Sequence, residues 1–272
     1  MIPWRPMHAI VARDLKRMIR QRGRLVSSMA RPLIWLLVIG GGFGSLLEQL
    51  GREGYQYFLI AGILCMTLLF GAILASLAMV YDKEAGVMRM LMIAPFAHPW
   101  ILVARTLSAA FVGLAHALLL LALLAAMGFL QTLPHLPLLA AGMAITALFS
   151  ASLGTLIAVF SKTLENFAVI MNFFIFPVFF LSGALYPIEH LPDALKIATL
   201  LNPFSYCVDL LKHALLPRAD LPPDFAADFS VARDLLLLVS CMAATLAISC
   251  LRFSRPQVLE RLAARLSDGR RG

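Results

Sequence analysis

The stretch that decides the fold covers residues 54–81 and reads GYQYFLIAGILCMTLLFGAILASLAMVY. It contains no Asp, Glu, Lys or Arg. An α-helix needs about 20 consecutive, mostly apolar residues to cross the hydrocarbon core of a bilayer. Because the stretch exceeds that length without a single charge, it predicts a transmembrane helix.

Further apolar stretches on both sides of this one have a similar length. The predicted spans are roughly 27–47, 57–80, 102–130, 137–160, 167–186 and 233–252. The first and last are short, and they reach full length if arginines at their ends extend into the interface. We therefore predict an all-α, polytopic membrane protein with six transmembrane helices.

The composition points to lipid as the solvent. The chain is 61% hydrophobic and 14% charged, whereas soluble domains are about half apolar and a quarter charged. A soluble domain of this size could not hide so much apolar surface. The net charge of +8 comes largely from arginines before the first apolar stretch and after the last. This distribution is typical of membrane orientation signals and argues against a nucleic-acid partner.

Basic residues also set the predicted orientation. An even number of spans puts both termini on one side, and the basic terminal segments place that side in the cytoplasm. A secretory signal peptide is the rival interpretation of the N-terminus. Its basic region is too long, however, and no small-x-small cleavage site follows the apolar stretch.

The chain is predicted to form one membrane domain with short appendages. Residues 1–26 have apolar positions at helical spacing among arginines, which is typical of an amphipathic helix in the cytoplasmic interface; a plain orientation signal is the alternative. Residues 27–253 form the transmembrane domain, and residues 254–272 form a basic cytoplasmic tail.

Two connecting segments have a character of their own. The loop at 82–100 carries methionines on one side of a short helix, which suits docking into a partner's groove, although a simple connector also fits. The segment at 182–230 is broken by prolines. It predicts two short helices within about 187–216, either re-entrant or lying in the interface. Asn202 and Pro203 are expected to cap the second of them.

Residues that carry chemistry are scarce. The sequence has no phosphate-binding loop and no hydrolase or metalloprotease motif. Its four cysteines form no CxxC pair and have no zinc-like histidine spacing, so we expect neither a metal site nor a disulfide. Ion-driven carriers bury carboxylates along their path. The spans show none mid-membrane, and Arg31 and Arg105 near their ends are expected to snorkel to the interface.

Two features within the spans leave alternatives open. His116, in the third span, either forms a hydrogen bond with a neighbouring helix or carries protons, and the first is favoured. The fifth span is rich in phenylalanine and contains Pro177, which predicts a kink. Its aromatic rings either face lipid and the core or form a wall for an amphiphilic substrate.

Two blocks of residues resemble the ABC-2 family of ABC-transporter permeases. One block is FLSGALYPIEHLP at 180–192 followed by LNPFSY at 201–206. The other is the loop at 82–95, which fits the E-x-G-x-x-x-x-L-x-x-x-P pattern of that family's cytoplasmic coupling helix. Within the family, the chain is most similar to small bacterial permeases of the nodulation-factor and drug-export type.

The resemblance implies an exporter of lipid-like, glycan or drug substrates in the bacterial inner membrane. Such permeases pair with a second copy or a related permease, and each binds a separate ATP-binding subunit that holds ATP and Mg, so this chain needs no cofactor and is not itself an enzyme. The resemblance also assigns roles to residues. Coupling falls to Glu84, Gly86, Arg89, Leu91 and Pro95; the outer gate to Gly183, Tyr186, Pro187, Asn202 and Pro203; and the substrate path to Asn172, Phe173, Phe176 and Phe180.

Other functions predict features of their own. A non-transporting assembly subunit, such as the membrane component of a cytochrome-maturation complex, can share this architecture and is the main alternative. A channel or secondary carrier predicts buried ionisable groups or filter loops. A membrane-embedded enzyme predicts clustered His, Asp or Glu near one membrane face. The sequence pattern indicates neither the buried ionisable groups or filter loops of a carrier nor the clustered residues of an enzyme.

Overall fold

The computed structural model describes residues 4–20, 23, 30, 32–42, 55–88, 99–129, 135–215 and 227–268. Within these ranges the chain forms helices joined by turns and contains no strand, which confirms the all-α prediction. The elements are α1 (Trp4–Arg20), η1 (Leu36–Gly40), α4 (Tyr55–Glu84), α6 (Pro99–Ala126), α7 (Leu136–Phe160), α8 (Leu164–Ile170), η2 (Met171–Ile175), α9 (Phe176–Phe180), η3 (Ile188–His190), α10 (Asp193–Leu201), α11 (Pro203–Leu215) and α12 (Val231–Asp268).

Four of the described helices are long and apolar enough to cross a membrane. They are Phe58–Glu84, Pro99–Ala126, Leu136–Phe160 and Val231–Phe253, and they correspond to four of the six predicted spans. The predicted fifth span is a shorter apolar helix, Leu164–Phe180. Only part of the predicted first span is described, as helix at 32–42. Six spans therefore stay a prediction.

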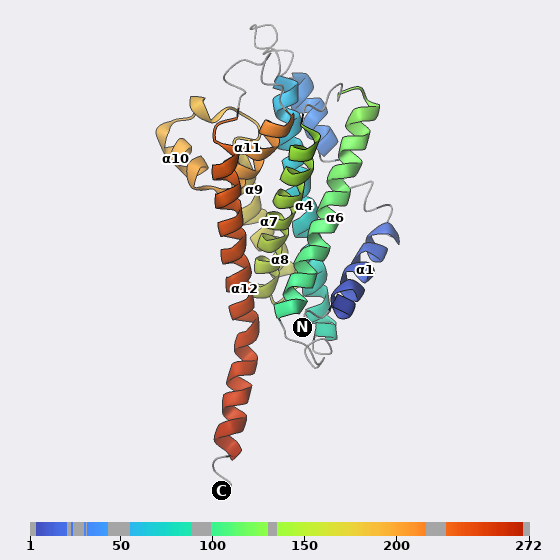
Figure 1. Cartoon of the computed structure of the whole chain (residues 1–272), viewed down its shortest axis with the longest axis vertical. Helices are drawn as coiled ribbons and strands as arrows, with labels where there is room; N and C mark the ends of the chain where they lie inside the picture. Colours follow the sequence, from blue (N-terminus) through green and yellow to red (C-terminus); the bar gives the residue numbers. More distant parts are fainter. Residues whose placement is uncertain are drawn as a thin grey trace.

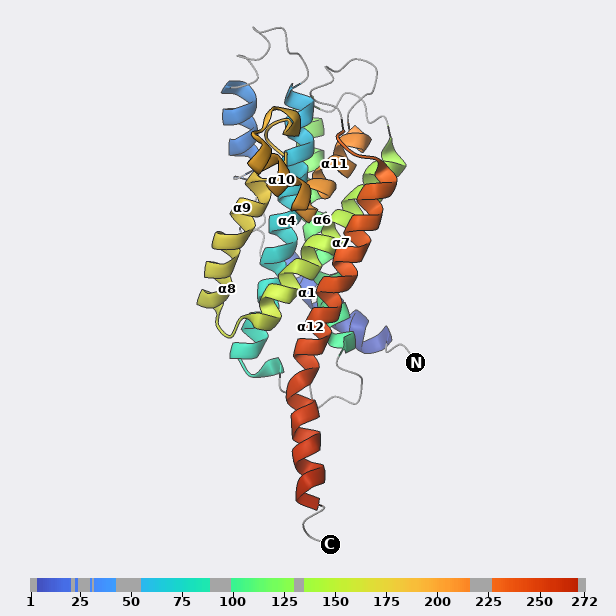
Figure 2. The same cartoon turned by 90° about the vertical axis from the view of Figure 1, so that its left-hand side faces the viewer.

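Helix α4 forms the centre of the bundle because it is apolar on all sides. It packs against α6, α7 and α11, and Figures 1 and 2 show it enclosed by these helices. Small residues let the backbones approach closely. A Cβ atom on Gly71 would lie 3.2 Å from the Cα of Gly113, and one on Gly154 would lie 2.5 Å from the hydroxyl of Ser76.

The fifth predicted span is not a regular α-helix. The π-helical turn η2 separates α8 from α9, and Pro177 is the second residue of α9. Because proline has no amide hydrogen and its ring clashes with the preceding turn, regular α-helical bonding cannot continue through this region. The predicted irregularity at Pro177 thus takes the form of a π-turn.

The two short helices after α9 differ in burial. Helix α10 is largely exposed, whereas α11 is buried almost throughout between α4, α7 and α12. Even the charged residues Asp209 and Lys212 of α11 are buried. A re-entrant path through the membrane stays a prediction.

Both ends of the chain lie toward the same end of the bundle, which we call the lower end after Figure 1. Helix α4 ends and α6 begins there, and α12 extends beyond the bundle past its apolar part. The opposite, upper end holds α10, α11 and the start of α12 (Figure 2). That the lower end faces the cytoplasm stays a prediction from the arginine distribution.

Candidate functional site

Three successive charged residues end α4, and together they contact four other helices. They are Asp82, Lys83 and Glu84, and we call them the α4 terminal cluster. Successive residues of an α-helix project about 100° apart. Three in a row therefore reach neighbours on three sides, which makes the lower end of α4 a junction of the bundle.

Asp82 joins α4 to α1 and α6. Its carboxylate accepts from Arg13 at 2.8 Å and forms a buried ion pair with Arg105. Arg105 also pairs with Asp14 of α1 at 2.9 Å, and Asp14 accepts from the Ser108 hydroxyl at 3.0 Å. Residues from three helices thus form one ionic network.

The structure corrects the expectation that Arg105 snorkels to the interface. Its side chain is only 4% exposed, because two carboxylates provide the partners that a buried guanidinium requires. The prediction was wrong because both partners come from other helices. Asp14 did carry a signal, since it is the only acid in the basic N-terminal stretch.

Lys83 joins α4 to the end of α7. Its ammonium donates to the carbonyl oxygens of Ala158 at 2.5 Å, Val159 at 3.0 Å and Ser161 at 3.2 Å. The last carbonyls of a helix have no intrahelical partner and carry partial negative charge. The lysine therefore caps α7.

Glu84 joins α4 to the start of α8. Its carboxylate accepts from the backbone amide of Leu164 at 2.9 Å, beside the N-cap Thr163, whose side chain accepts from Asn166 at 3.2 Å. A carboxylate at a helix N-terminus is favoured by the helix dipole. Lys83 and Glu84 together hold both sides of the turn between α7 and α8.

The predicted coupling residues begin in this cluster. Glu84 belongs to it, and Gly86, two residues after the end of α4, has a φ of +74°, a conformation that glycine adopts at little cost. Arg89, Leu91 and Pro95 lie outside the described residues. Coupling itself stays a prediction for all five.

The upper end of α4 contacts the segment that follows α9. A Cβ atom on Gly62 would lie 2.0 Å from the carbonyl oxygen of Ala184, so only glycine fits there. Nearby, the Tyr55 hydroxyl donates to the carbonyl of Leu185 at 3.0 Å. One helix therefore connects the terminal cluster at the lower end with residues 184–185 at the upper end.

Asn202 holds two helix ends together. Its amide donates to the carbonyls of Val178 at 2.6 Å and Leu181 at 3.1 Å, at the end of α9, and its oxygen accepts from the amide of Phe204 at 3.0 Å. Pro203 is the first residue of α11. The predicted cap of this helix is thus confirmed.

The other predicted gate residues lie in the same segment. Gly183 has a φ of +70°, the Tyr186 hydroxyl donates to the carbonyl of Phe180, and Pro187 precedes η3. Burial raises the pKa of Tyr186, so this hydroxyl keeps its proton at neutral pH. Their role as a gate stays a prediction.

Replacing Asn202 with alanine should lower the free energy of unfolding by about 2–3 kcal/mol. The change removes the cap of α11 and leaves carbonyls at the end of α9 without a donor. Asn202→Ser should lose about half as much, because a serine oxygen can still cap α11. Denaturant unfolding in detergent micelles measures both, and an alanine variant as stable as the parent chain would contradict the double role.

The four predicted path residues do not share one environment. Asn172 and Phe173 lie on the exposed side of η2, with Phe173 84% exposed. Phe176 packs instead against Phe70 with ring centroids 5.4 Å apart, and Phe180 lies 5.7 Å from Trp35. The choice between lipid contact and a substrate wall stays open.

His116 is buried but does not reach across to another helix. Its Nδ1 lies 2.7 Å from the carbonyl of Val112, one turn earlier in α6. The expectation of a hydrogen bond to a neighbouring helix is therefore wrong, because the partner lies in the same helix. The ring packs instead beside Gly71, where α4 and α6 approach closely.

Several apolar helices of spanning length, with charges gathered at their ends, define a multi-pass membrane protein. The profile of the ABC-2 type transporter family matches residues 6–216. The chain belongs to this family, whose members are membrane components of ABC transporters and work with an ATP-binding subunit.

Curated relatives agree with this assignment. Nodulation protein J of Rhizobium leguminosarum bv. trifolii is 27% identical over 202 residues, which cover 71% of this chain and 74% of the relative. Nodulation protein J of Rhizobium meliloti is 25% identical over the same shares of the two chains. The protein ycf38 of Pyropia yezoensis, named as a transport permease, is 28% identical over 74% of this chain and 70% of its own length.

Proposed function

We propose that this chain is the membrane subunit of an ATP-driven exporter. Two copies, or one copy and a related permease, would move a lipid-like, glycan or drug substrate out of the cytoplasm or inner leaflet. A separate subunit would bind ATP and Mg and dock on residues 84–95. The name of one relative, a transport permease, supports a role in transport.

The observation that carries this proposal is the α4 terminal cluster. It directly precedes the proposed docking loop and contacts α1, α6, α7 and α8. A displacement of the loop would therefore be delivered to four helices at once. Because α4 continues to the segment after α9, the same displacement would reach the proposed outer gate.

Glu84→Ala should uncouple ATP hydrolysis from transport. The variant loses the contact with α8 but keeps Asp82 and Lys83, so the bundle should still assemble. Transport per ATP hydrolysed should fall at least about fivefold, because coupling between sites is typically worth 1–3 kcal/mol. Inside-out vesicles that hold the chain and its ATP-binding subunit measure both rates when ATP and a labelled phospholipid, a lipid-linked oligosaccharide or a hydrophobic drug are supplied on their outer, cytoplasmic face.

The matched control is Glu165→Ala, which removes an exposed carboxylate from the first turn of α8. It should transport as the parent does. Normal coupling in Glu84→Ala would refute the role of Glu84. ATP hydrolysis by the complex without movement of any probe would favour the assembly-subunit alternative, and hydrolysis by this chain alone would contradict the proposal.

A further inference from the structure

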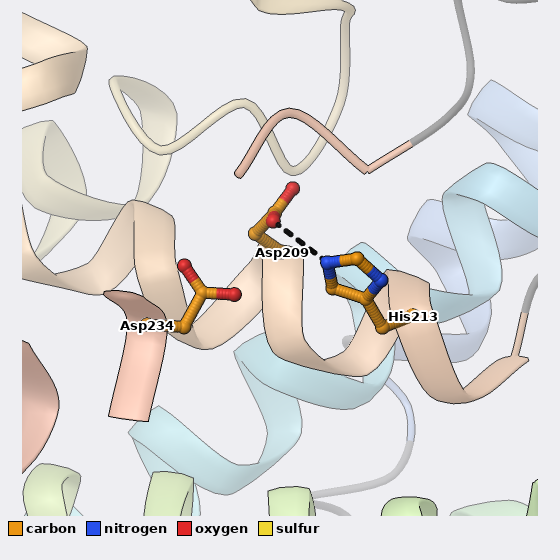
Figure 3. Close-up of side chains that lie close together, drawn as sticks. All are labelled: Asp209, His213 and Asp234. Atoms are coloured by element: carbon orange, nitrogen blue, oxygen red, sulfur yellow. Dashed lines mark ion pairs between the residues drawn. The ribbon is translucent and has the colours of Figure 1, made fainter. Parts of the chain in front are cut away.

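A group of metal-ligating side chains lies at the upper end, away from the α4 terminal cluster. Asp209 and His213 share one face of α11, because residues four apart are neighbours on a helix. Asp234 approaches them from the first turn of α12. One ligand atom of each lies within 4.8 Å of the others, and Figure 3 shows the three side chains close together, with Asp209 between Asp234 and His213.

Asp234 is buried and forms no ion pair among the described residues. The residue is 0% exposed, and neither carboxylate oxygen has a hydrogen-bond partner. A carboxylate removed from water without compensation is costly. Asp234 faces a second carboxylate, that of Asp209, so a cation bound between the two would offset both charges.

Two basic side chains of α11 and α12, Lys212 and Arg233, make their direct contacts with other groups. Lys212 pairs with Asp228 at 3.0 Å and lies over the ring of Phe58. The guanidinium of Arg233 lies over the ring of Phe229, 4.8 Å from its centroid. Neither cation forms an ion pair with Asp234 among the described residues.

Asp209 and His213 are held in place by the chain before α12. Asp209 accepts from the amides of Asp228 at 2.6 Å and Phe229 at 3.0 Å. The Nε2 of His213 lies 2.7 Å from the carbonyl of Phe229 and 3.5 Å from Asp209. Burial raises the pKa of Asp209, and the two amides oppose that change. The ligands are thus positioned in advance.

We propose that Asp209, His213 and Asp234 bind a first-row divalent transition metal ion. Zn²⁺ is the ion used to test this proposal. One imidazole nitrogen with carboxylate oxygens is a set that zinc accepts, whereas Ca²⁺ and Mg²⁺ prefer oxygen alone. Ligation through Nε2 needs the imidazole proton on Nδ1, a change of tautomer without a change of charge. The carbonyl of Phe229 then becomes free to supply a further oxygen.

Metal binding would join α11 to α12. Ligands about 2.0–2.1 Å from a tetrahedral Zn²⁺ are about 3.4 Å apart, and the three atoms already lie within 4.8 Å of one another. The ion would therefore fasten the buried helix α11 to the last span. This inference concerns the chain itself and does not depend on export.

Metal binding by the full chain, purified in detergent without a polyhistidine tag, tests the proposal. After exposure to Zn²⁺ and gel filtration, we expect one Zn²⁺ per chain by mass spectrometry and a higher melting temperature. Co²⁺ in place of Zn²⁺ should give visible absorption bands of low coordination number. Ca²⁺ should produce neither stoichiometric binding nor a shift.

Two variants separate the site from general stability. Asp234→Asn removes an unpaired buried charge, so without metal the variant should melt at or above the temperature of the parent chain. Its Zn²⁺ affinity should nevertheless fall at least about tenfold. Loss of a residue that only hydrogen-bonds a metal ligand already lowers metal affinity by about that factor, and Asp234 is proposed as a ligand itself. Asp228→Asn, which changes a neighbouring carboxylate paired with Lys212, should bind Zn²⁺ as the parent does.

Either of two results would overturn the proposal. The first is a parent chain that retains no Zn²⁺ and shows no Co²⁺ absorption, a measurement that needs no variant. The second is an Asp234→Asn chain that binds Zn²⁺ as tightly as the parent, which would place the bound metal elsewhere.

Discussion

Replacing Arg105 with methionine should lower the free energy of unfolding by about 3–5 kcal/mol, the usual cost of breaking a buried ion pair. Arg105 is 4% exposed and pairs with both Asp14 and Asp82. Its loss leaves two largely buried carboxylates to be balanced by Arg13 alone. Denaturant unfolding in detergent micelles, followed by circular dichroism, measures the effect.

Two controls show whether this cost arises from charge. Arg13→Gln removes the more exposed cation of the network, at 46% exposure, and should cost less than about 1 kcal/mol, as surface ion pairs do. Adding Asp14→Asn and Asp82→Asn to Arg105→Met removes the stranded charges and should restore much of the stability. An Arg105→Met variant as mild as Arg13→Gln would show that the network contributes little.

Gly62→Ala should be the most disruptive single-methyl change in the described part of the bundle. The new Cβ would lie 2.0 Å from the carbonyl oxygen and 2.8 Å from the carbonyl carbon of Ala184. Both are backbone atoms, so the segment after α9 must move as a whole. We expect a loss of about 3 kcal/mol or more, at the upper end of overpacking effects.

Gly41→Ala is the matched control, because nothing lies within 4 Å of a Cβ atom at that helical position. Alanine should be neutral there or stabilise by up to about 1 kcal/mol through its higher helix propensity. Thiol labelling of a cysteine introduced at Leu185 reports whether the segment has moved. Unchanged labelling and stability in Gly62→Ala would contradict the close contact with Ala184.

Local patterns predicted the features that depend on local physics. The charge-free stretch at 54–81 predicted α4, and the pair Asn202–Pro203 predicted the start of α11, because hydropathy and capping act within one helix. The resemblance to the ABC-2 family identified the family of the chain.

Features that depend on contacts between distant segments could not be predicted. Arg105 pairs with Asp14, which is 91 residues away in the chain. Asp209 accepts hydrogen bonds from backbone amides 19 and 20 residues later. The expectation of no metal site considered cysteine and histidine spacing alone, whereas the set proposed above contains two aspartates from two helices. The run Asp82-Lys83-Glu84 at the end of an apolar stretch is the one sequence feature that points to the junction.

Helix α4 should be stiffer than the path from α8 through η2 to α9. Helix α4 contains neither proline nor a π-turn in the 30 residues from Tyr55 to Glu84, a length of about 45 Å. The path from α8 to α9 contains both within a few residues. Strain applied through Glu84 should therefore pass along α4 with little bending and be absorbed in η2, which would rotate Asn172 and Phe173 relative to the rest of the bundle.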